Sequence, residues 1–202
     1  MKVLIVDYEL GNLASVKNIF KSINVDVIVS NKVREIKNSN LIVLPGVGNF
    51  SSAVKNLKKK KIFNFLKFQI KKGKPTLGIC LGMQLLFKSS EEGEKCQEGF
   101  GIFKYRIKKM KKLNIGWHKI ISKKKNFLFK DLNKKLFYFN HSYGLLENTS
   151  VSKFYVSNHS PLSSIVKKKN IIGVQFHPEK SQDSGEEFIN LVLKTLNILK
   201  NE

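Results

Sequence analysis

Cys80 lies at the junction of two segments of different character in the stretch KPTLGICLGMQLLF. The apolar residues 76–79 predict a buried strand and residues 81–87 predict the start of a helix, so the cysteine falls on the turn between them. Gly78 and Gly82 lie two residues to either side, and they allow the sharp turn of a nucleophile elbow. A lone free cysteine is usually an inert core residue. Here the glycines, and a helix N-terminus that favours the thiolate, indicate a nucleophile.

A histidine and a carboxylate that could serve this thiol follow the last predicted strand, 171–176, in the sequence His177-Pro178-Glu179. Residues i and i+2 of an extended backbone project to the same side, so imidazole and carboxylate can lie together, and the proline stiffens that arrangement. If this strand runs parallel to the strand before Cys80, all three side chains meet at one edge of the sheet. The thiolate would attack a substrate, the imidazole would transfer protons, and the carboxylate would orient the imidazole.

The other three histidines, His118, His141 and His159, have no carboxylate two residues further on. We expect each of them to be a surface or polar-packing residue. No Cys or His pairs stand at zinc-ligand spacing, and two cysteines, Cys80 and Cys96, do not make a disulfide framework. The sequence therefore predicts thiol chemistry in a reducing cytoplasm, with no metal and no other cofactor.

The elements that must position these residues alternate between strand and helix in the first half of the chain. Such alternation predicts an α/β fold with a mainly parallel sheet, whose strands are apolar throughout because both faces are buried. Strands are predicted at 3–6, 25–29 and 41–44, and helices from Leu13 with Asn12 as N-cap, near 33–37, and over 62–70 up to Gly73.

A glycine-rich loop, Pro45-Gly46-Val47-Gly48, follows the third of these strands. Open α/β sheets bind ligands at the carboxyl ends of their strands, and such a loop leaves backbone N–H groups free to face a ligand. It could supply one arm of an oxyanion hole. The alternative is a turn with no such role, which is common for glycine-rich loops.

The second half of the chain has a different pattern. Residues 98–121 and 135–176 contain short strand-like runs joined by Lys- and Ser-rich turns, which predict an antiparallel extension of the sheet. A terminal helix is predicted from a capping box, Ser184 to Glu187, with Phe188, Val192, Leu196 and Leu199 on its apolar face. We expect one domain, residues 1–202, built as an open twisted sheet flanked by helices.

Charge is the most unusual feature of the composition, at a formal +22 for 202 residues. A basic protein suggests nucleic acid or another polyanion as partner, but only Arg34 and Arg106 are arginines, the residue that phosphate and base recognition favours. The lysine runs lack the interleaved aromatic residues of a stacking groove, so we expect a solvated lysine surface. The lysine runs are 58–61, 108–112, 123–125 and 167–169. No apolar run in the sequence is long enough to span a membrane.

The spacing Gly78-x-Cys80-x-Gly82-x-Gln84, with His177-x-Glu179 about a hundred residues later, resembles the class I (triad) glutamine amidotransferases over essentially the whole chain. That motif identifies only the class. Three stretches are similar to the glutaminase subunits of imidazole glycerol phosphate synthases: DYELGNLASV at 7–16, PGVGNF at 45–50 and FHPEKSQDSG at 176–185. The resemblance implies a flavodoxin-like glutamine amidotransferase domain over residues 1–202 and a place in histidine biosynthesis.

The resemblance also implies roles for individual residues. Cys80 would attack the side-chain amide of L-glutamine to form a thioester and release ammonia, with His177 and Glu179 completing the triad. The backbone N–H groups of Leu81 and, after a peptide flip, Val47 would form the oxyanion hole. Ammonia would pass to a (β/α)₈-barrel cyclase partner in a heterodimer. Glutamine would be held by Gly48, Gln84 and Ser142, and the partner would be met by Asn12, Trp117 and Lys180.

Three positions depart from the pattern of that family. Glu9 stands where Gly is expected, His118 where Asn follows the Trp, and Gly144 where an aromatic residue follows His-Ser-Tyr. None belongs to the triad, so they bear on partner docking rather than on glutaminase chemistry.

Three alternative functions stay open at this point. The chain could serve a paralogous synthase, for example one that amidinates a sugar. A cysteine peptidase or other hydrolase of the same fold is disfavoured by Gln84 and the loop 45–48. A polyanion-binding protein with a vestigial elbow is disfavoured by the intact triad.

Overall fold

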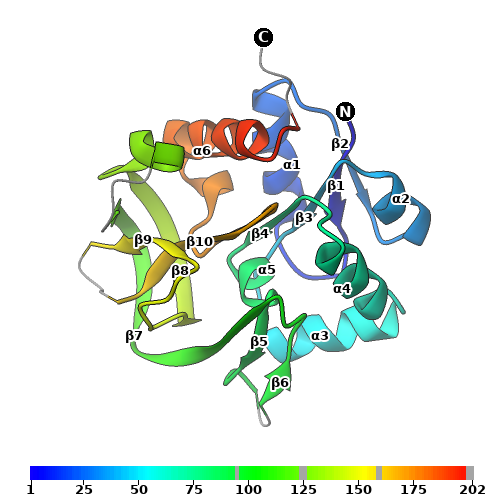
Figure 1. Ribbon diagram of the computed structural model, residues 1–202, viewed down its shortest axis with the longest axis horizontal. Coiled ribbons are helices and arrows are strands. Elements are labelled where there is room, and N and C mark those ends of the chain that lie inside the picture. The colour runs from blue at the N-terminus through cyan, green and yellow to red at the C-terminus, as the bar shows by residue number, and fades with distance from the viewer. Residues whose placement is uncertain (94–95, 123–126, 158–160, 199–202) are drawn as a thin grey trace.

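The fold is known from a computed structural model that describes residues 1–93, 96–122, 127–157 and 161–198 (Figure 1). Five parallel strands form one part of its sheet, and each lies within two residues of a strand that the sequence predicts. The β-α alternation thus gives the parallel sheet we expected. In spatial order these strands are β2 (Val27–Ser30), β1 (Val3–Val6), β3 (Leu41–Leu44), β4 (Thr76–Ile79) and β11 (Ile171–Val174).

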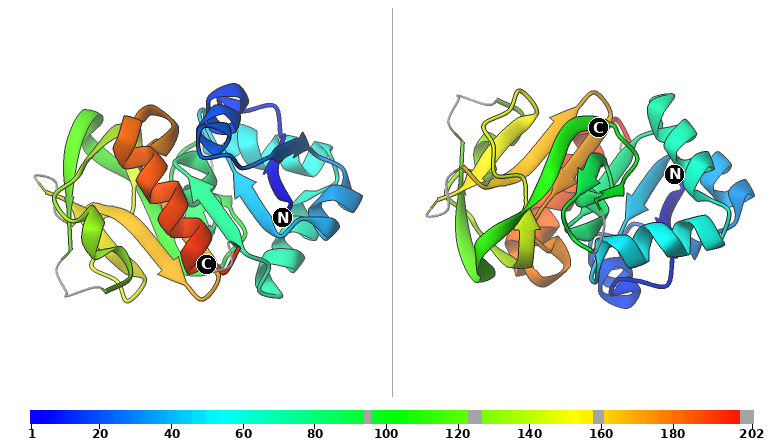
Figure 2. Two further views of the ribbon diagram at one scale, coloured as in Figure 1. Left: turned by 90° about the horizontal axis from the view of Figure 1, so that it is seen from above. Right: turned by 90° about the horizontal axis from the view of Figure 1, so that it is seen from below.

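Helices cover both faces of this parallel part, as Figure 2 shows from above and below. Helices α1 (Leu13–Ser22) and α6 (Gln182–Thr195) pack on one face, and α2 (Val33–Asn38), α3 (Phe50–Lys59) and α4 (Phe63–Lys71) on the other. Alternate residues of β1 enter the two cores, which explains its unbroken apolar sequence. No helix among the described residues is long and apolar enough to cross a membrane.

The remaining strands extend the sheet beyond β11. They pair antiparallel with their neighbours, as predicted, except that β5 runs parallel to β7. The long strand β7 carries β5 along one half and β8 and β9 along the other, so it holds the extension together. These strands are β5 (Phe87–Ser90), β6 (Gln97–Glu98), β7 (Phe103–Ile121), β8 (Leu136–Gly144), β9 (Ser152–Val156) and β10 (Ser163–Lys168); a 3₁₀ segment, η1 (Phe127–Leu132), precedes β8.

Helix α1 begins where the sequence predicts. The Asn12 side chain accepts a hydrogen bond from the backbone N–H of Ser15 at 3.1 Å, so Asn12 is the N-cap. This bond fixes the end of the loop that joins β1 to α1, and it leaves the amide NH₂ of the exposed Asn12 facing outward from the cap.

Two predicted helix boundaries are wrong. The elbow helix α5 (Leu81–Gln84) is one turn long, because the chain extends again at Phe87, which is fully buried against Phe103 at 5.0 Å between ring centroids. Helix α6 begins at Gln182, so Ser184 lies inside its first turn and the capping box with Glu187 does not form; Glu187 pairs instead with Lys135. Three predicted features lie outside the described residues: Leu199, His159 and the lysine run 123–125.

Candidate active site

Cys80 occupies a strained turn between β4 and α5. Its backbone lies at φ 48° and ψ −107°, outside the regions that L-residues favour, and its N–H donates to the Val174 carbonyl at 2.7 Å. A Cβ at Gly78 would lie 2.7 Å from the Gly82 carbonyl oxygen, and one at Gly82 would lie 1.9 Å from that of Leu44. Both glycines are therefore required by close backbone approach, as the elbow pattern predicts.

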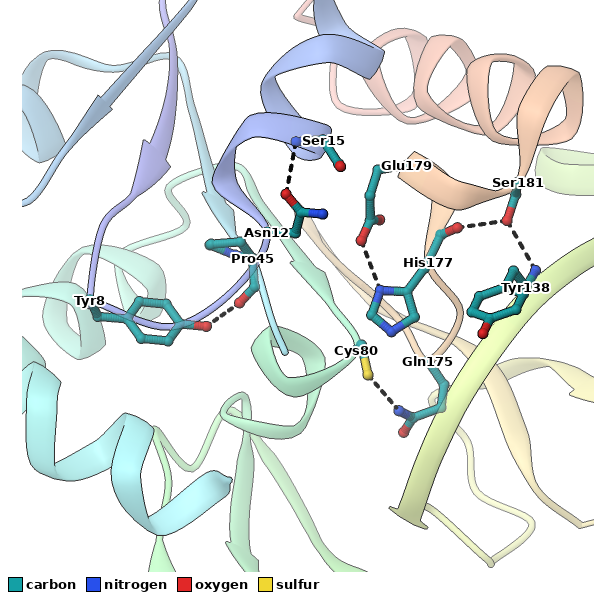
Figure 3. Close-up of polar contacts among 10 residues, drawn as sticks. All are labelled: Tyr8, Asn12, Ser15, Pro45, Cys80, Tyr138, Gln175, His177, Glu179 and Ser181. Carbon is teal, nitrogen blue, oxygen red and sulfur yellow. Dashed lines mark hydrogen bonds and ion pairs between the residues drawn. The ribbon is translucent and has the colours of Figure 1, made fainter. Parts of the chain in front are cut away.

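The parallel pairing of β11 with β4 brings the histidine to the thiol. Val174 lies opposite Ile79, so Cys80 and His177 leave the sheet at the same edge. His177 Nδ1 lies 2.8 Å from Glu179 Oε1, both side chains are 2% exposed, and the imidazole lies beside the Cys80 sulfur (Figure 3). The backbone path differs from the predicted extended one, because Glu179 lies in a 3₁₀ turn, η2 (Pro178–Lys180).

Hydrogen bonds to strand β8 fix the backbone of this turn. The His177 N–H donates to the Tyr138 carbonyl at 2.8 Å, and the Ser181 hydroxyl donates to the His177 carbonyl at 2.6 Å. The same hydroxyl accepts from the Tyr138 N–H at 3.0 Å. Since Glu179 takes Nδ1, the other ring nitrogen faces the sulfur.

Charge stabilises the imidazole in its protonated form. Burial alone would lower the pKa of His177, but the neighbouring thiolate of Cys80 and the hydrogen-bonded carboxylate of Glu179 raise this pKa to about 10. A protonated imidazole is therefore paired with the Cys80 sulfur at neutral pH. Such a pair supplies a nucleophile and a proton donor at the same edge of the sheet.

A cavity of about 140 Å³ opens beside the thiol. Every residue that the sequence assigns to substrate or oxyanion binding lines it. The Leu81 N–H is the first of α5 and has no acceptor within that helix, so it is free to face a ligand. The lining residues are Val47, Gly48, Cys80, Leu81, Gln84, Glu92, Asn140, His141, Ser142, Tyr143, His177 and Lys180.

Tyr8 supports the loop that carries Val47. The fully buried Tyr8 hydroxyl donates to the Pro45 carbonyl (Figure 3). Burial, and then the charge of Cys80, raise the pKa of Tyr8, so the phenol keeps its proton and stays a donor. A Cβ at Gly46 would lie 2.5 Å from the Gly82 N–H nitrogen, so this loop packs directly on the elbow.

Two polar residues of the site were not predicted. Glu92 lines the cavity and accepts a hydrogen bond from the Phe50 N–H at 2.9 Å; burial raises its pKa. Nothing in the sequence marks it, since it follows a short strand in a polar turn. Gln175 is fully buried and its side-chain amide lies 3.6 Å from the Cys80 sulfur. Its place two residues before His177 could have indicated it, because residues i and i+2 of a strand face the same side.

Of the predicted partner residues, Lys180 lines the cavity and is exposed, whereas Asn12 and Trp117 do not line it. Asn12 is exposed, and the Trp117 side chain is 44% exposed on β7. Of the histidines set aside, His141 lines the cavity and bonds to Asn114 and the Tyr143 carbonyl, both at 2.8 Å, so it is a polar-packing residue at the site.

The departures from the expected pattern have local explanations. Glu9 has a positive φ of 64°, a conformation that favours glycine, and its carboxylate pairs with Lys60 at 2.9 Å. A Cβ at Gly144 would lie 2.7 Å from the Leu162 side chain, so an aromatic residue there would displace Leu162. His118 packs edge-on against Phe139.

Comparison with known proteins identifies the family of the chain. The model of the family described as glutamine amidotransferase class-I matches residues 4–194. The chain belongs to that family. As a class I glutamine amidotransferase it is an enzyme.

Curated relatives of this amidotransferase span nearly its full length. The imidazole glycerol phosphate synthase subunit HisH of Prochlorococcus marinus subsp. pastoris is 38% identical over 96% of this chain and 98% of its own. The subunit of the same name from Caldanaerobacter subterraneus subsp. tengcongensis is 39% identical over 98% and 95%. A crystal structure of a glutamine amidotransferase superposes with a TM-score of 0.78, 14% identity and coverage of 96% and 98%, which shows the shared fold.

Proposed function

We propose that this amidotransferase is the HisH glutaminase subunit of an imidazole glycerol phosphate synthase and that Cys80, His177 and Glu179 are its catalytic triad. One observation carries the proposal: a cysteine on an elbow lies beside a buried, hydrogen-bonded His-Glu pair and lines a cavity with it. The full-length relatives named HisH support the choice of synthase.

The reaction follows from the charges of the triad. The Cys80 thiolate attacks the carboxamide carbon of glutamine, and the negative charge that moves to the amide oxygen is stabilised by the N–H groups of Leu81 and Val47. The imidazolium of His177 gives its proton to the departing nitrogen, so ammonia leaves and a glutamyl thioester remains. His177 then accepts a proton from water, which attacks the thioester, and glutamate and the thiolate are released.

The cavity has the polar groups that a free amino acid needs. Gly48, Gln84 and Ser142 present backbone and side-chain polar atoms to it, and Glu92 is its one carboxylate among the described lining residues. A half-buried carboxylate next to a zwitterionic substrate is best paired with the ammonium group. Glu92 would therefore bind the α-amino group of glutamine and help to exclude amides that lack one.

An exposed apolar face next to the triad suits a partner subunit. Ile115 and Trp117 on β7 and Leu136 on β8 are 52%, 44% and 44% exposed. Trp117 packs edge-on against Tyr138, and Lys180 lies over the Tyr138 ring with its Nζ 5.5 Å from the centroid. Contiguous exposed apolar side chains mark interaction sites.

The partner that we propose for this face is the (β/α)₈-barrel cyclase, docked near Asn12, Trp117 and Lys180. The described residues form one sheet and the helices that cover it. We propose that ammonia is consumed on this other polypeptide, in the cytoplasm, where thiols such as Cys80 and the exposed Cys96 stay reduced.

Complementation tests the acceptor pathway. The chain, co-expressed with the barrel cyclase from its own source in a host that lacks its own glutaminase subunit, should restore growth without histidine. Failure of a well-expressed, glutaminase-competent protein to do so would favour a paralogous synthase such as one that amidinates a sugar. Glu9 and His118 keep that alternative open, since both lie close in sequence to the proposed docking residues.

Partner dependence tests separately whether the cyclase controls glutamine hydrolysis. The oxyanion hole needs the Val47 N–H to turn toward the thioester oxygen, and docking is expected to bias that peptide flip. The isolated chain should therefore turn over glutamine far more slowly than the complex with acceptor nucleotide. Equal rates for the two would contradict gating by the partner.

A further inference from the structure

Gln175 connects the nucleophile to the substrate cavity through its side-chain amide. The side chain is fully buried, and a buried amide is costly unless both of its ends are hydrogen bonded. Its Nε2 donates to the Cys80 sulfur at 3.6 Å, and its Oε1 accepts from Gln84 Nε2 at 3.3 Å (Figure 3 shows the first of these). Both ends are thus occupied by residues of the site.

The orientation of this amide follows from a chain of hydrogen bonds that starts on β7. The Tyr143 carbonyl can only accept, so the neutral His141 ring, 2.8 Å away, donates to it through Nδ1 and accepts from Asn114 through Nε2. The same carbonyl accepts from Gln84 Nε2 at 2.9 Å. Gln84 therefore turns its NH₂ group toward Gln175, and the Gln175 side chain accepts that hydrogen bond through its oxygen.

The consequence is that Gln175 has only its NH₂ group left for the sulfur. An N–H donor stabilises a thiolate more than a thiol, because hydrogen bonds to charged acceptors are the stronger ones. His177 holds the same sulfur through its imidazolium. The thiolate is thus contacted by two donors from one segment, the residues that follow β11.

We propose that Gln175 is a positioning residue that stabilises and orients the Cys80 thiolate and ties it to Gln84 in the substrate cavity. The proposal rests on Cys80 being the nucleophile of the proposed function. During acylation the sulfur loses its charge and this hydrogen bond weakens; when water breaks the thioester, the departing thiolate regains it. Gln175 would therefore assist most in the hydrolysis of the thioester.

Alkylation by iodoacetamide tests this without partner or glutamine, because only the thiolate reacts. The alkylation rate of the full chain is measured against pH in a Cys96→Ser background, in which Cys80 is the remaining cysteine. Gln175→Leu should move the midpoint of that profile to a pH about one unit higher, the size expected for one charge-assisted hydrogen bond. Gln69→Leu, on the surface helix α4, is the matched control and should leave the midpoint unchanged.

The outcome that overturns the proposal is a folded Gln175→Leu chain whose alkylation profile coincides with that of the parent. A merely structural role would lower the melting temperature and leave the midpoint in place. If Gln175→Leu does not fold, Gln175→Glu decides, since it keeps the acceptor for Gln84 and puts a carboxylate at the sulfur, and its midpoint should rise further.

The wild-type chain gives an answer even if neither variant folds. The side-chain amide signal of Gln175 in a ¹⁵N-labelled protein should titrate with the same midpoint as alkylation, and a flat signal would refute the proposal. These results do not depend on the acceptor pathway. Failure of the proposed glutaminase function would appear instead as glutamine turnover that survives loss of Cys80.

Discussion

At the scale of single residues, the chemistry depends on one sulfur atom. Cys80→Ala removes the only described group that can form a thioester at the elbow, and alanine fills the same backbone position. Glutamine hydrolysis by the complex should fall by about three orders of magnitude or more. Ammonia release with partner and acceptor nucleotide measures this, and Cys96→Ala, which changes an exposed thiol away from the cavity, is the matched control. Near wild-type turnover by Cys80→Ala would remove the nucleophile from the mechanism.

The charge on His177 gives a second prediction at this scale. Its pKa of about 10 is raised chiefly by the Cys80 thiolate and by Glu179, against the effect of burial. Because the folded-state pKa exceeds the unfolded value of about 6.5, this group stabilises the fold fully below pH 6.5 and loses that effect as the pH rises toward 10. In Cys80→Ala the largest raising cause is absent, so the pKa of His177 should fall.

Ring ¹³C and ¹H shifts of His177, followed by NMR from pH 5 to pH 10.5, measure that pKa in both proteins. A Cys96→Ala chain serves as the control and should titrate like the wild type. Identical titration curves for the wild type and Cys80→Ala would show that no thiolate faces the imidazole.

At the scale of elements, helix α6 fixes the turn that carries Glu179. A Cβ at Gly185 would lie 2.0 Å from the Pro178 carbonyl oxygen, so Gly185→Ala must push turn η2 away from the helix. We expect a destabilisation of about 2 kcal/mol or more and a loss of glutaminase activity through a displaced Glu179. Urea unfolding and ammonia release measure the two effects.

The control for that substitution is Gly73→Ala at the end of α4. Gly73 has a positive φ of 95° and no atom within 4 Å of a built Cβ. The change should cost only the backbone strain of about 1 to 2 kcal/mol and leave catalysis intact. An active Gly185→Ala chain with unchanged stability would contradict close packing of α6 on η2.

Elements also show what the sequence could predict and what it could not. The parallel strands were predictable because burial on both faces requires continuous apolar runs. The elbow was predictable because close backbone approach requires glycine at positions 78 and 82. The one-turn length of α5 was not, because it is set by tertiary packing of Phe87. Glu92 reaches the cavity from a turn whose position depends on a bond to Phe50, 42 residues away, so no local pattern could reveal it.

At the scale of the whole molecule, the excess of positive charge calls for a test of its own. Lysine and arginine number 37 against 15 acidic residues, and the described ion pairs use only a few of them. Lysine contacts to phosphate give salt-dependent binding without sequence preference. Anisotropy titration should therefore show weak nucleic-acid binding that disappears at physiological salt. Tight, sequence-selective binding there would revive a polyanion-binding role.

The exposed apolar face of β7 and β8 is the surface that we propose for the partner subunit. Trp117 lies among Ile115 and Leu136 and packs on Tyr138, whose carbonyl holds the backbone of His177. A tryptophan at the centre of such a face is the usual anchor of an interface, worth about 2 kcal/mol or more. Trp117→Ala should therefore raise the Kd for the barrel cyclase by about 30-fold or more, with glutaminase activity retained at saturating partner.

Titration of the chain with the cyclase by calorimetry measures this effect, and Phe68→Ala is its matched control. Phe68 is an aromatic residue of comparable exposure, 51%, but it lies on α4, away from β7 and β8 (Figure 1). The Kd of Phe68→Ala should equal that of the wild type. Equal effects of the two substitutions would mean that the cyclase docks elsewhere. A loss of activity in Trp117→Ala that saturating partner cannot restore would instead assign Trp117 to the transmission of docking to the triad, since Tyr138 contacts both Trp117 and His177.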